Sequence, residues 1–296
     1  MKREYCVLNG RYVETAAARI SATDRGFLYG EGLFETWRCY RGRAFALDAH
    51  LGRMTRSAKT LGIPFDADEP WETRSRRLVE RNGLVESGAL VRLTITRGSG
   101  PIDLLATASR RPTRLMVTRG IDPTLPDKRR DGVSVCFVGT GRGGPGGLGS
   151  IKSVNYLAAV LGKAEAKKRG AFEALYTTVD GNVLEGTTSN VFARFGSTLV
   201  TTPIADGVLP GVTRALVLRL AARLADVEQR TIARSELARA DELFLTASSI
   251  EVLPVVRIGR RRVGDGRPGE LTRALQPRYR RAVARSLGVG VEELGA

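Results

Sequence analysis

Two residues near the middle of the chain have side chains that could do covalent chemistry together. Lys152 lies in the segment 151–156 (IKSVNY), and Glu185 follows a predicted strand turn further along the chain. A lysine amine can hold an aldehyde cofactor as a Schiff base, and a carboxylate can keep the ring nitrogen of such a cofactor protonated. A predicted helix that begins at Val154 would lower the pKa of Lys152, because a helix N-terminus disfavours a cation. Either residue alone is more typical of an exposed surface, so the elements around them matter.

The first 119 residues predict a small α+β domain. Strands at 5–8 and 12–14 flank Asn9-Gly10, a turn whose two residues tolerate positive φ, and strands at 33–40 and 44–47 flank the turn 41–43. We expect Asp48 to cap the next helix. That helix would place on one face Leu51, Met54, Ala58 and Leu61.

The rest of this domain comprises a helix at 72–81 and two further strands. Residues 90–97 alternate between apolar and polar side chains, as a half-buried strand does, with Arg92 on the polar face. Residues 115–118 form the last strand. Residues 120–132 are rich in proline, aspartate and basic side chains and predict a linker.

The predicted second domain, residues 133–296, alternates strands with helices. A helix at 154–169 carries Leu157, Val160, Leu161 and Ala164 on one stripe at helical spacing. The predicted strands are 133–138, 173–179, 182–185, 189–195, 198–201, 242–246 and 252–258, and the other helices are 212–224 and 271–287. The strands at 173–179 and 182–185 would pair across Asp180-Gly181.

Residues 139–144 (GTGRGG) match the glycine pattern of a dinucleotide-binding loop after a strand. That pattern requires a helix directly after it and an acidic residue at the end of the next strand. Pro145 and further glycines interrupt it, and the next strand ends too late, at Asp180. We therefore interpret this segment as a flexible loop beside an active site.

Composition bounds the class of protein. The chain has 296 residues and a formal net charge of +16, but its arginines are scattered and no zinc-finger or RNP-like pattern accompanies them. We therefore do not expect nucleic acid as a partner, although so basic a chain should attract phosphorylated or carboxylated small molecules. The three cysteines fit neither a disulfide framework nor a metal site. No apolar run suits a membrane span or a signal peptide, so the expected location is cytoplasmic.

Six segments, in order along nearly the whole chain, resemble the fold-type IV pyridoxal-phosphate enzymes. This family contains branched-chain aminotransferases, D-amino acid aminotransferases and aminodeoxychorismate lyases. The segments are DRGFLYGEGLFE at 24–35, HLGR at 50–53, KSVNY at 152–156, EGTTSN at 185–190, LPGVTR at 209–214 and LTASSIEVLPV at 245–255. The resemblance implies an α/β (α+β) fold with a small N-terminal sandwich, a larger C-terminal pseudobarrel and the cofactor in the cleft between them.

The resemblance also implies a role for each matching position. Lys152 would form the Schiff base and then act as acid and base for a proton shift, and Glu185 would pair with the ring nitrogen of pyridoxal 5'-phosphate. The other positions implied to contact the cofactor are Arg53, Val212, Thr213, Ser248 and Ser249 at its phosphate, Leu209 on its ring face and Tyr156 near its phenolic oxygen. His50, the only histidine, is expected to be structural.

The implied reaction is amino transfer between an amino acid and a 2-oxo acid. Tyr29, Phe34 and Arg92 would form the substrate pocket; Arg92 resembles the carboxylate-binding arginine of branched-chain enzymes, although Leu90 stands where these have a tyrosine. The TRG segment at 96–98 lacks the arginine and histidine that follow it in D-amino acid enzymes. The best-fitting substrates are a branched-chain L-amino acid and 2-oxoglutarate. The alternatives are an aminodeoxychorismate lyase that releases 4-aminobenzoate and a D-amino acid or amine transaminase.

The family resemblance further implies a homodimer with shared active sites. Tyr29 and Phe34 commonly reach across the dimer interface in this family. Arg38, Arg41 and Arg43 could meet a distal substrate carboxylate, the alternative being an exposed, solvated hairpin.

Overall fold

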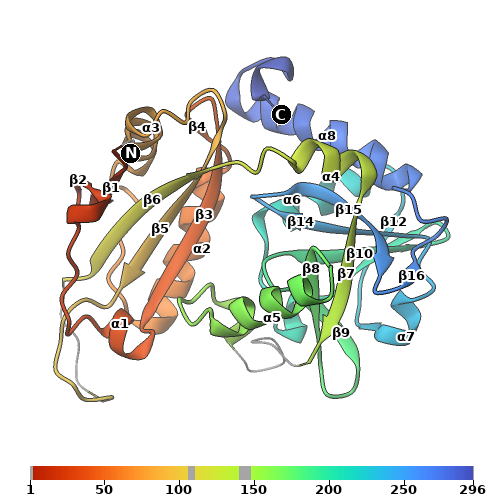
Figure 1. Ribbon diagram of the computed structural model, residues 1–296, viewed down its shortest axis with the longest axis horizontal. Helices are drawn as coiled ribbons and strands as arrows, with labels where there is room; N and C mark the ends of the chain where they lie inside the picture. The colour runs from red at the N-terminus through yellow and green to blue at the C-terminus, as the bar shows by residue number, and fades with distance from the viewer. Residues whose placement is uncertain (1–2, 106–110, 140–147, 296) are drawn as a thin grey trace. The chain divides into compact units, whose positions relative to one another are not determined.

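The computed structural model describes residues 3–105, 111–139 and 148–295. The chain forms two compact units, drawn in Figure 1. The first unit comprises residues 1–122, 151–155 and 284–296, and the second comprises residues 123–150 and 156–283. Two segments of the predicted second domain, 151–155 and 284–296, thus pack with the first unit. Most of the glycine run at 139–144 lies outside the described residues.

The first unit is built on a six-stranded antiparallel sheet in the order β2-β1-β6-β5-β3-β4. Its strands are β1 (Tyr5–Leu8), β2 (Arg11–Glu14), β3 (Gly32–Tyr40), β4 (Arg43–Ala44), β5 (Ala89–Thr96) and β6 (Thr113–Gly120). Its helices are α1 (Arg25–Tyr29), α2 (Leu47–Leu61) and α3 (Trp71–Arg81), with short 3-10 turns η1 (Thr15–Ala17) and η4 (Glu292–Leu294). The predicted hairpin turn at Asn9-Gly10 is confirmed, with φ of 49° and 83°.

Helices α2 and α3 cover one face of this sheet and bury its core. The alternating side chains of β5 make the pattern clear, since Val91, Leu93 and Ile95 are buried while Arg92 and Thr94 are half-buried. This alternation, predicted from the sequence, leaves one strand face for the core and the other for polar contacts.

The second hairpin differs from the prediction in its second strand. Strand β4 has only two residues, and the chain turns into α2 through Ala46, which has φ of 53°. Asp48 is therefore not the cap; it lies inside the first turn of α2, where its charge still favours the helix N-terminus. The predicted buried face of α2 is confirmed for Leu51, Met54 and Ala58.

The second unit contains a ten-stranded mixed sheet in the order β12-β11-β10-β14-β15-β7-β8-β9-β13, with β16 beside β15. Its strands are β7 (Val133–Val138), β8 (Glu173–Thr177), β9 (Asn182–Gly186), β10 (Asn190–Phe195), β11 (Thr198–Thr201), β12 (Asp226–Gln229), β13 (Ile232–Ala233), β14 (Glu242–Ala247), β15 (Glu251–Ile258) and β16 (Arg261–Arg262). Contacts between β9 and β10 curve the sheet back toward itself, as expected of a pseudobarrel.

The helical elements of the second part of the chain are η2 (Leu148–Ser150), η3 (Ile204–Asp206), α4 (Leu125–Asp131), α5 (Leu157–Lys168), α6 (Val212–Ala221), α7 (Arg234–Leu237) and α8 (Glu270–Leu287). The predicted linker is wrong in one respect, because it contains α4. The Leu125 side chain is buried, and Pro126 at the start of α4 suits the first helical turn. Among the described residues, no helix is both long and apolar enough to cross a membrane.

Helix α5 buries the face opposite to its apolar stripe. The helix approaches the sheet through small residues, and a Cβ atom on Gly162 would lie only 2.5 Å from the Thr187 methyl carbon. The stripe is instead exposed to solvent: the exposed fractions are 69% for Leu157, 59% for Val160 and 61% for Leu161. Helical spacing of apolar residues predicts that such a stripe exists, but it does not predict which part of the protein packs against it.

Candidate active site

Lys152 is fixed to the first unit by backbone hydrogen bonds. The Phe34 N–H donates to the Lys152 carbonyl at 2.9 Å, and the Val154 N–H donates to the Gly32 carbonyl at 3.0 Å. An isolated β-bridge pairs Ser153 with Leu33, so the lysine lies directly beside the start of β3. The predicted start of the next helix at Val154 is wrong: α5 begins only at Leu157, so Lys152 lies outside the turn in which a helix dipole acts.

The other end of the Lys152 segment is joined to helix α1. The Asn155 side-chain amide donates to the Gly30 carbonyl at 3.1 Å. Gly30 has φ of 70°, and a Cβ atom there would lie 2.0 Å from Asn155 Oδ1, so the contact requires glycine. Tyr29, the last residue of α1, stacks against the Arg25 guanidinium, whose Cζ is 4.7 Å from the ring centroid.

Two cations lie against the ring of Phe34. The Lys152 Nζ atom is 4.4 Å and the Arg92 Cζ atom 3.5 Å from its centroid. The negative face of an aromatic ring attracts cations, so Phe34 can hold both side chains close together despite their mutual repulsion. Two of the three residues predicted for the substrate pocket, Phe34 and Arg92, are thus brought together with the predicted Schiff-base lysine.

Arg53 makes a buried ion pair with Glu35 of β3. Arg53 Nε donates to Glu35 Oε1 and Nη2 donates to Oε2, both at 2.7 Å. Burial alone would raise the pKa of Glu35, but the charge and hydrogen bonds of Arg53, with a further hydrogen bond to His50, lower it to about 2. The carboxylate therefore fixes the plane of the Arg53 guanidinium.

His50 is buried on the other side of the same carboxylate, with Nδ1 2.7 Å from Glu35 Oε2. Burial lowers the pKa of His50; Glu35 opposes this, whereas the charges of Arg53 and Lys152 lower it further. The imidazole is consequently neutral near pH 7. Its contacts are with Glu35 and with Trp37, whose ring centroid is 6.4 Å away.

The three arginines proposed for a distal carboxylate are separately engaged, and this interpretation is not supported. Arg38 is buried with its Cζ 4.6 Å from the Tyr40 ring centroid, and Arg41 Nη2 pairs with Glu86 at 2.5 Å. Arg43 Nη1 donates to the Leu287 carbonyl at 2.8 Å.

Glu185, in the second unit, has one carboxylate oxygen held by two donors. Oε2 accepts from the Asn190 side-chain amide and from the Leu209 N–H, each at 3.0 Å. Asn190 also donates to the Leu209 carbonyl at 2.9 Å, so it joins the Glu185 strand to the segment before α6. A Cβ atom on Gly211 would lie 2.1 Å from Asn190 Oδ1, which accounts for glycine at that position.

The loop between Glu185 and Asn190 is tied to a buried carboxylate, Glu173 of β8. All three hydroxyls of the loop donate to it: Thr187, Thr188 at 2.9 Å and Ser189 at 3.3 Å. Lys163 Nζ of α5 balances its charge at 3.2 Å. The hydroxyl-rich run thus orients the loop, and the loop in turn orients Glu185.

Helix α6 begins directly after Gly211, which provides no side-chain cap. The first backbone N–H groups of a helix suit a phosphate, and the first turn contains Val212 and the buried Thr213. Arg214 behind them donates from Nη2 to the Thr202 carbonyl and to Gln229 Oε1, each at 2.9 Å. Burial lowers the pKa of Arg214, and the nearby Glu185 charge opposes that effect.

Ser248 and Ser249 lie in the tight turn between β14 and β15. The Ile250 N–H donates to the Ala247 carbonyl at 3.1 Å, and Glu251, with φ of 59°, follows. This conformation is uncommon for a non-glycine residue and is held by an ion pair to Arg129 at 3.2 Å. Strain of this kind is concentrated at functional turns. Tyr156 lies in the same unit, with its hydroxyl 3.5 Å from the Thr187 carbonyl.

Three residues that hold the site together have no role predicted from the sequence. Glu35 and Asn190 lie within the recognised motifs, and Glu173 lies outside them. Each acts by holding another site residue through a hydrogen bond. A motif identifies the position of such a residue, but only the three-dimensional contact shows its partner.

Comparison with known proteins identifies the family of the chain. The family model of class IV aminotransferases matches residues 32–258. A Methanocaldococcus jannaschii protein provisionally named a branched-chain-amino-acid aminotransferase is 34% identical, over 92% of this chain and 94% of that protein. A Bacillus licheniformis D-alanine aminotransferase is also 34% identical (91% and 94% covered), as is a Bacillus subtilis aminodeoxychorismate lyase (93% and 94% covered).

Solved structures show the same fold. The branched-chain amino acid aminotransferase of Escherichia coli superposes with a TM-score of 0.85 at 27% identity, over 93% of each chain. The branched-chain aminotransferase of Thermoproteus uzoniensis, solved with norvaline, gives a TM-score of 0.84 at 27% identity, over 96% of each chain.

Proposed function

The chain belongs to the class IV aminotransferases, enzymes that depend on pyridoxal phosphate, and we propose that it moves an amino group from a branched-chain L-amino acid to 2-oxoglutarate. The observation that carries the proposal is the position of Lys152, paired to β3 with its amine beside Phe34 and Arg92. An amine and a guanidinium around one aromatic ring suit a substrate that has a carboxylate next to the reacting carbon.

Bound pyridoxal phosphate supplies an aldehyde that condenses with amines and a ring that withdraws electrons. We assign the covalent attachment to Lys152 Nζ, which then carries the proton removed from the α-carbon of the substrate. Glu185 is assigned to the ring nitrogen, and its fixed Oε2 supports that role because a held carboxylate need not reorganise when charge develops.

We assign the phosphate of the cofactor to Arg53, Val212, Thr213, Ser248 and Ser249. The support is chemical: a guanidinium held in one plane by Glu35, the uncapped start of α6 and hydroxyls in a strained turn are all anion-binding features.

Three further residues are assigned by their place in the fold. Leu209 is assigned to the ring face of the cofactor and Tyr156 to its phenolic oxygen. Tyr29, which stacks on Arg25 at the end of α1, completes the substrate pocket with Phe34 and Arg92.

The substrate class has two competitors within the family. The aminodeoxychorismate lyase of Bacillus subtilis and the D-alanine aminotransferase of Bacillus licheniformis are as similar in sequence as the branched-chain relative. Against a D-amino acid pocket, the residues that follow the TRG segment, SGPIDL at 99–104, include neither an arginine nor a histidine. Arg97 of the TRG segment pairs with Glu31 at 3.1 Å and donates to the carbonyls of residues 61 and 62. It is therefore engaged in holding its own unit.

Covalent trapping tests the assignment of Lys152. Borohydride treatment of the holoenzyme, followed by peptide mass spectrometry, should find the reduced cofactor on the peptide that contains Lys152. The Lys152→Ala variant should lack both the adduct and the visible absorbance, while Lys59→Ala, at an exposed position of α2, should retain both. A cofactor trapped on another lysine would contradict the assignment.

A substrate panel separates the reactions. Branched-chain L-amino acids should give 2-oxoglutarate-dependent keto acid formation. If 4-aminobenzoate is released from aminodeoxychorismate instead, or if D-alanine is the better donor, the substrate proposal is wrong although the cofactor assignment stands.

We further propose a homodimer with shared active sites, supported by the exposed apolar stripe of α5. Contiguous exposed apolar side chains at this spacing mark an interaction surface. We also propose a cytoplasmic location, supported by the thiols of Cys6, Cys39 and Cys136, which are all buried and all free of disulfides.

A further inference from the structure

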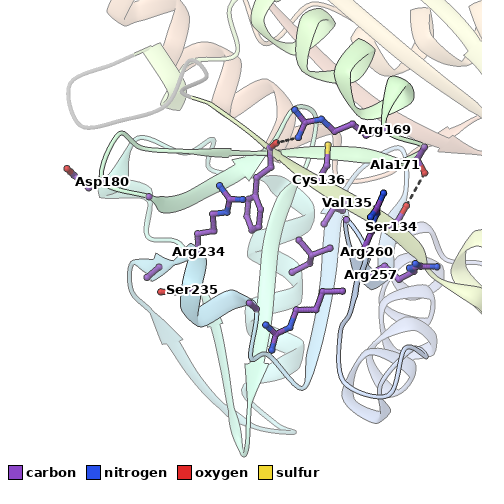
Figure 2. A pocket seen from close by; sticks show the side chains of 18 residues that line it. Ser134, Val135, Cys136, Arg169, Ala171, Asp180, Arg234, Ser235, Arg257 and Arg260 are labelled. Carbon is purple, nitrogen blue, oxygen red and sulfur yellow. Dashed lines mark hydrogen bonds between the residues drawn. The ribbon is translucent and has the colours of Figure 1, made fainter.

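A large groove lies on the second unit. It has a volume of about 1100 Å³ and is lined by β7, the turn after α5, the β8–β9 turn, the start of α7 and the β15–β16 turn. None of the lining residues is among those assigned to the cofactor or the substrate. Figure 2 shows the groove and its side chains.

The groove is strongly cationic for its size. Its lining contains five arginines, Arg169, Arg234, Arg257, Arg260 and Arg261, and one acidic residue, Asp180. The whole chain, by comparison, has 47 basic and 31 acidic residues, so high arginine usage alone does not produce this ratio. Asp180 lies well apart from Arg257 and Arg260 in Figure 2.

Some exposed arginines elsewhere in the molecule have carboxylate partners. Arg130 binds Asp127 and Asp131, and Arg230 binds Glu236 and Glu228. Within the part of the chain that the structure describes, the side chains of Arg257, Arg260 and Arg261 make no ion pair and no hydrogen bond. Unpaired like charges in one hollow repel each other and focus a positive potential into it.

Two arginines of the groove are already oriented. The Arg234 Cζ atom lies 4.5 Å from the centroid of the Phe137 ring, and Arg169 Nη1 donates to the Phe137 carbonyl at 3.2 Å. Arg169 also pairs with Glu165 at 2.6 Å, which neutralises one of the five charges. A held guanidinium loses less entropy when it binds an anion, and its planar fork matches two phosphate oxygens.

We propose that this arginine groove binds a small molecule that carries adjacent phosphate groups. Four of the five guanidinium groups in the groove have no carboxylate partner. A single phosphate or carboxylate could not contact all four at once. The volume of about 1100 Å³ is close to the upper end of the range for small-molecule sites, roughly 300–1,000 Å³. The proposal does not depend on the amino-transfer assignment.

Calorimetry on the holoenzyme with inorganic tripolyphosphate tests the proposal. At about 0.15 M salt, where exposed charges are screened beyond roughly 8 Å, we expect saturable binding with one site per chain. Arg260→Ala/Arg261→Ala should weaken binding by about tenfold or more, since charged hydrogen bonds are lost. Arg260→Lys/Arg261→Lys, which keeps the charge but not the fork, should weaken it less.

The control is Arg76→Ala/Arg77→Ala on α3, an exposed adjacent pair whose loss changes the net charge equally. It should leave binding unchanged. Equal weakening in both double variants, or no saturable binding, would overturn the proposal. Either result would mean that the net positive charge of the whole protein attracts the anion, with no specific site. Loss of the visible absorbance on titration would also overturn it, since the anion would be displacing the cofactor.

Two further ligands identify the source of the phosphates. Tighter binding of a nucleoside triphosphate than of tripolyphosphate would point to a nucleotide, with the Phe137 ring as a surface for the base, whereas equal affinity would point to the phosphate chain alone; both support the proposal. An oligonucleotide that binds with affinity rising with its length, where tripolyphosphate fails, would instead show a nucleic-acid surface.

Discussion

His50 gives the first unit a distinct pH dependence. It is the only histidine of the chain, is buried beside Glu35 and has a pKa below its ordinary value of 6.5. As the pH falls below about 6.5, His50 binds a proton in the unfolded chain but stays neutral in the folded chain. The free energy of unfolding must therefore decrease as the pH drops below that value. Glu35 contributes only further down, as the pH falls from 4.5 toward 2.

Urea unfolding of the apoenzyme between about pH 7 and pH 5 measures this effect. The wild type should lose up to about 1.4 kcal/mol per pH unit in this window, the value for one proton. His50→Gln, which has no titrating group, should show a smaller slope even if it is less stable throughout. Parallel slopes for the two proteins would contradict the role of His50.

Asn190 should control the affinity for the cofactor without touching the substrate. Asn190→Ala removes a donor to Glu185 Oε2 and the link to the Leu209 carbonyl. We expect the dissociation constant of pyridoxal phosphate to rise about tenfold, from the loss of a hydrogen bond to a charged group. Spectroscopic titration of the apoenzyme measures it. Asn182→Ala, on the neighbouring strand β9, is the control, and an equal effect there would refute the specific role.

Local chemistry made some residues predictable and left others hidden. Asn9-Gly10 predicts its turn because both residues favour positive φ themselves. Lys152 is recognisable from its motif, but its pairing with Gly32 and Phe34 depends on a segment far away in the sequence. The partners of Glu35 and Glu185 are hidden for the same reason.

Helices and strands were predictable where they were long enough to show a complete repeat of apolar residues. Most strands of both sheets and helices α2, α3, α6 and α8 follow from apolar spacing. Elements that are too short or too polar to give a period were missed: α1, α4, α7, β12, β13 and β16. The α5 stripe shows a different limit. Its spacing is helical, but the close approach at Gly162 decides which face is buried.

The exposed face of α5 predicts a concentration-dependent assembly. Leu161→Arg places a charge within the stripe and should convert the proposed dimer into monomers without unfolding the chain. Analytical ultracentrifugation with circular dichroism measures both properties. Lys167→Glu, an exposed position near the end of the same helix, should remain dimeric. A variant Leu161→Arg that stays dimeric would show that another surface makes the interface.

At the scale of the whole molecule, the chain passes between its two units four times, after residues 122, 150, 155 and 283. No continuous boundary predicted from composition could reproduce this. The C-terminal segment returns to the first unit, where Leu294 is 4% exposed and the Leu287 carbonyl accepts from Arg43.

Leu294→Ala should therefore destabilise the first unit, by about 2–4 kcal/mol for a buried leucine. Hydrogen exchange followed by mass spectrometry should show lost protection in β3 and β5 before β10 and β14. Val291→Ala, in the same segment but 37% exposed, should have little effect. Uniform loss of protection over the whole chain would show that the units unfold together.

The segment 151–155, which carries Lys152 and packs with the first unit, also limits how this protein can be divided. A gene cut between the codons for residues 122 and 123 would give one polypeptide with Phe34 and Arg92 and another with the lysine that pairs beside them. Neither half would contain the complete neighbourhood of the Lys152 amine, the proposed point of attachment of the cofactor. Co-expressed halves would regain that neighbourhood only by complementation, so attachment of the cofactor would report their reassembly.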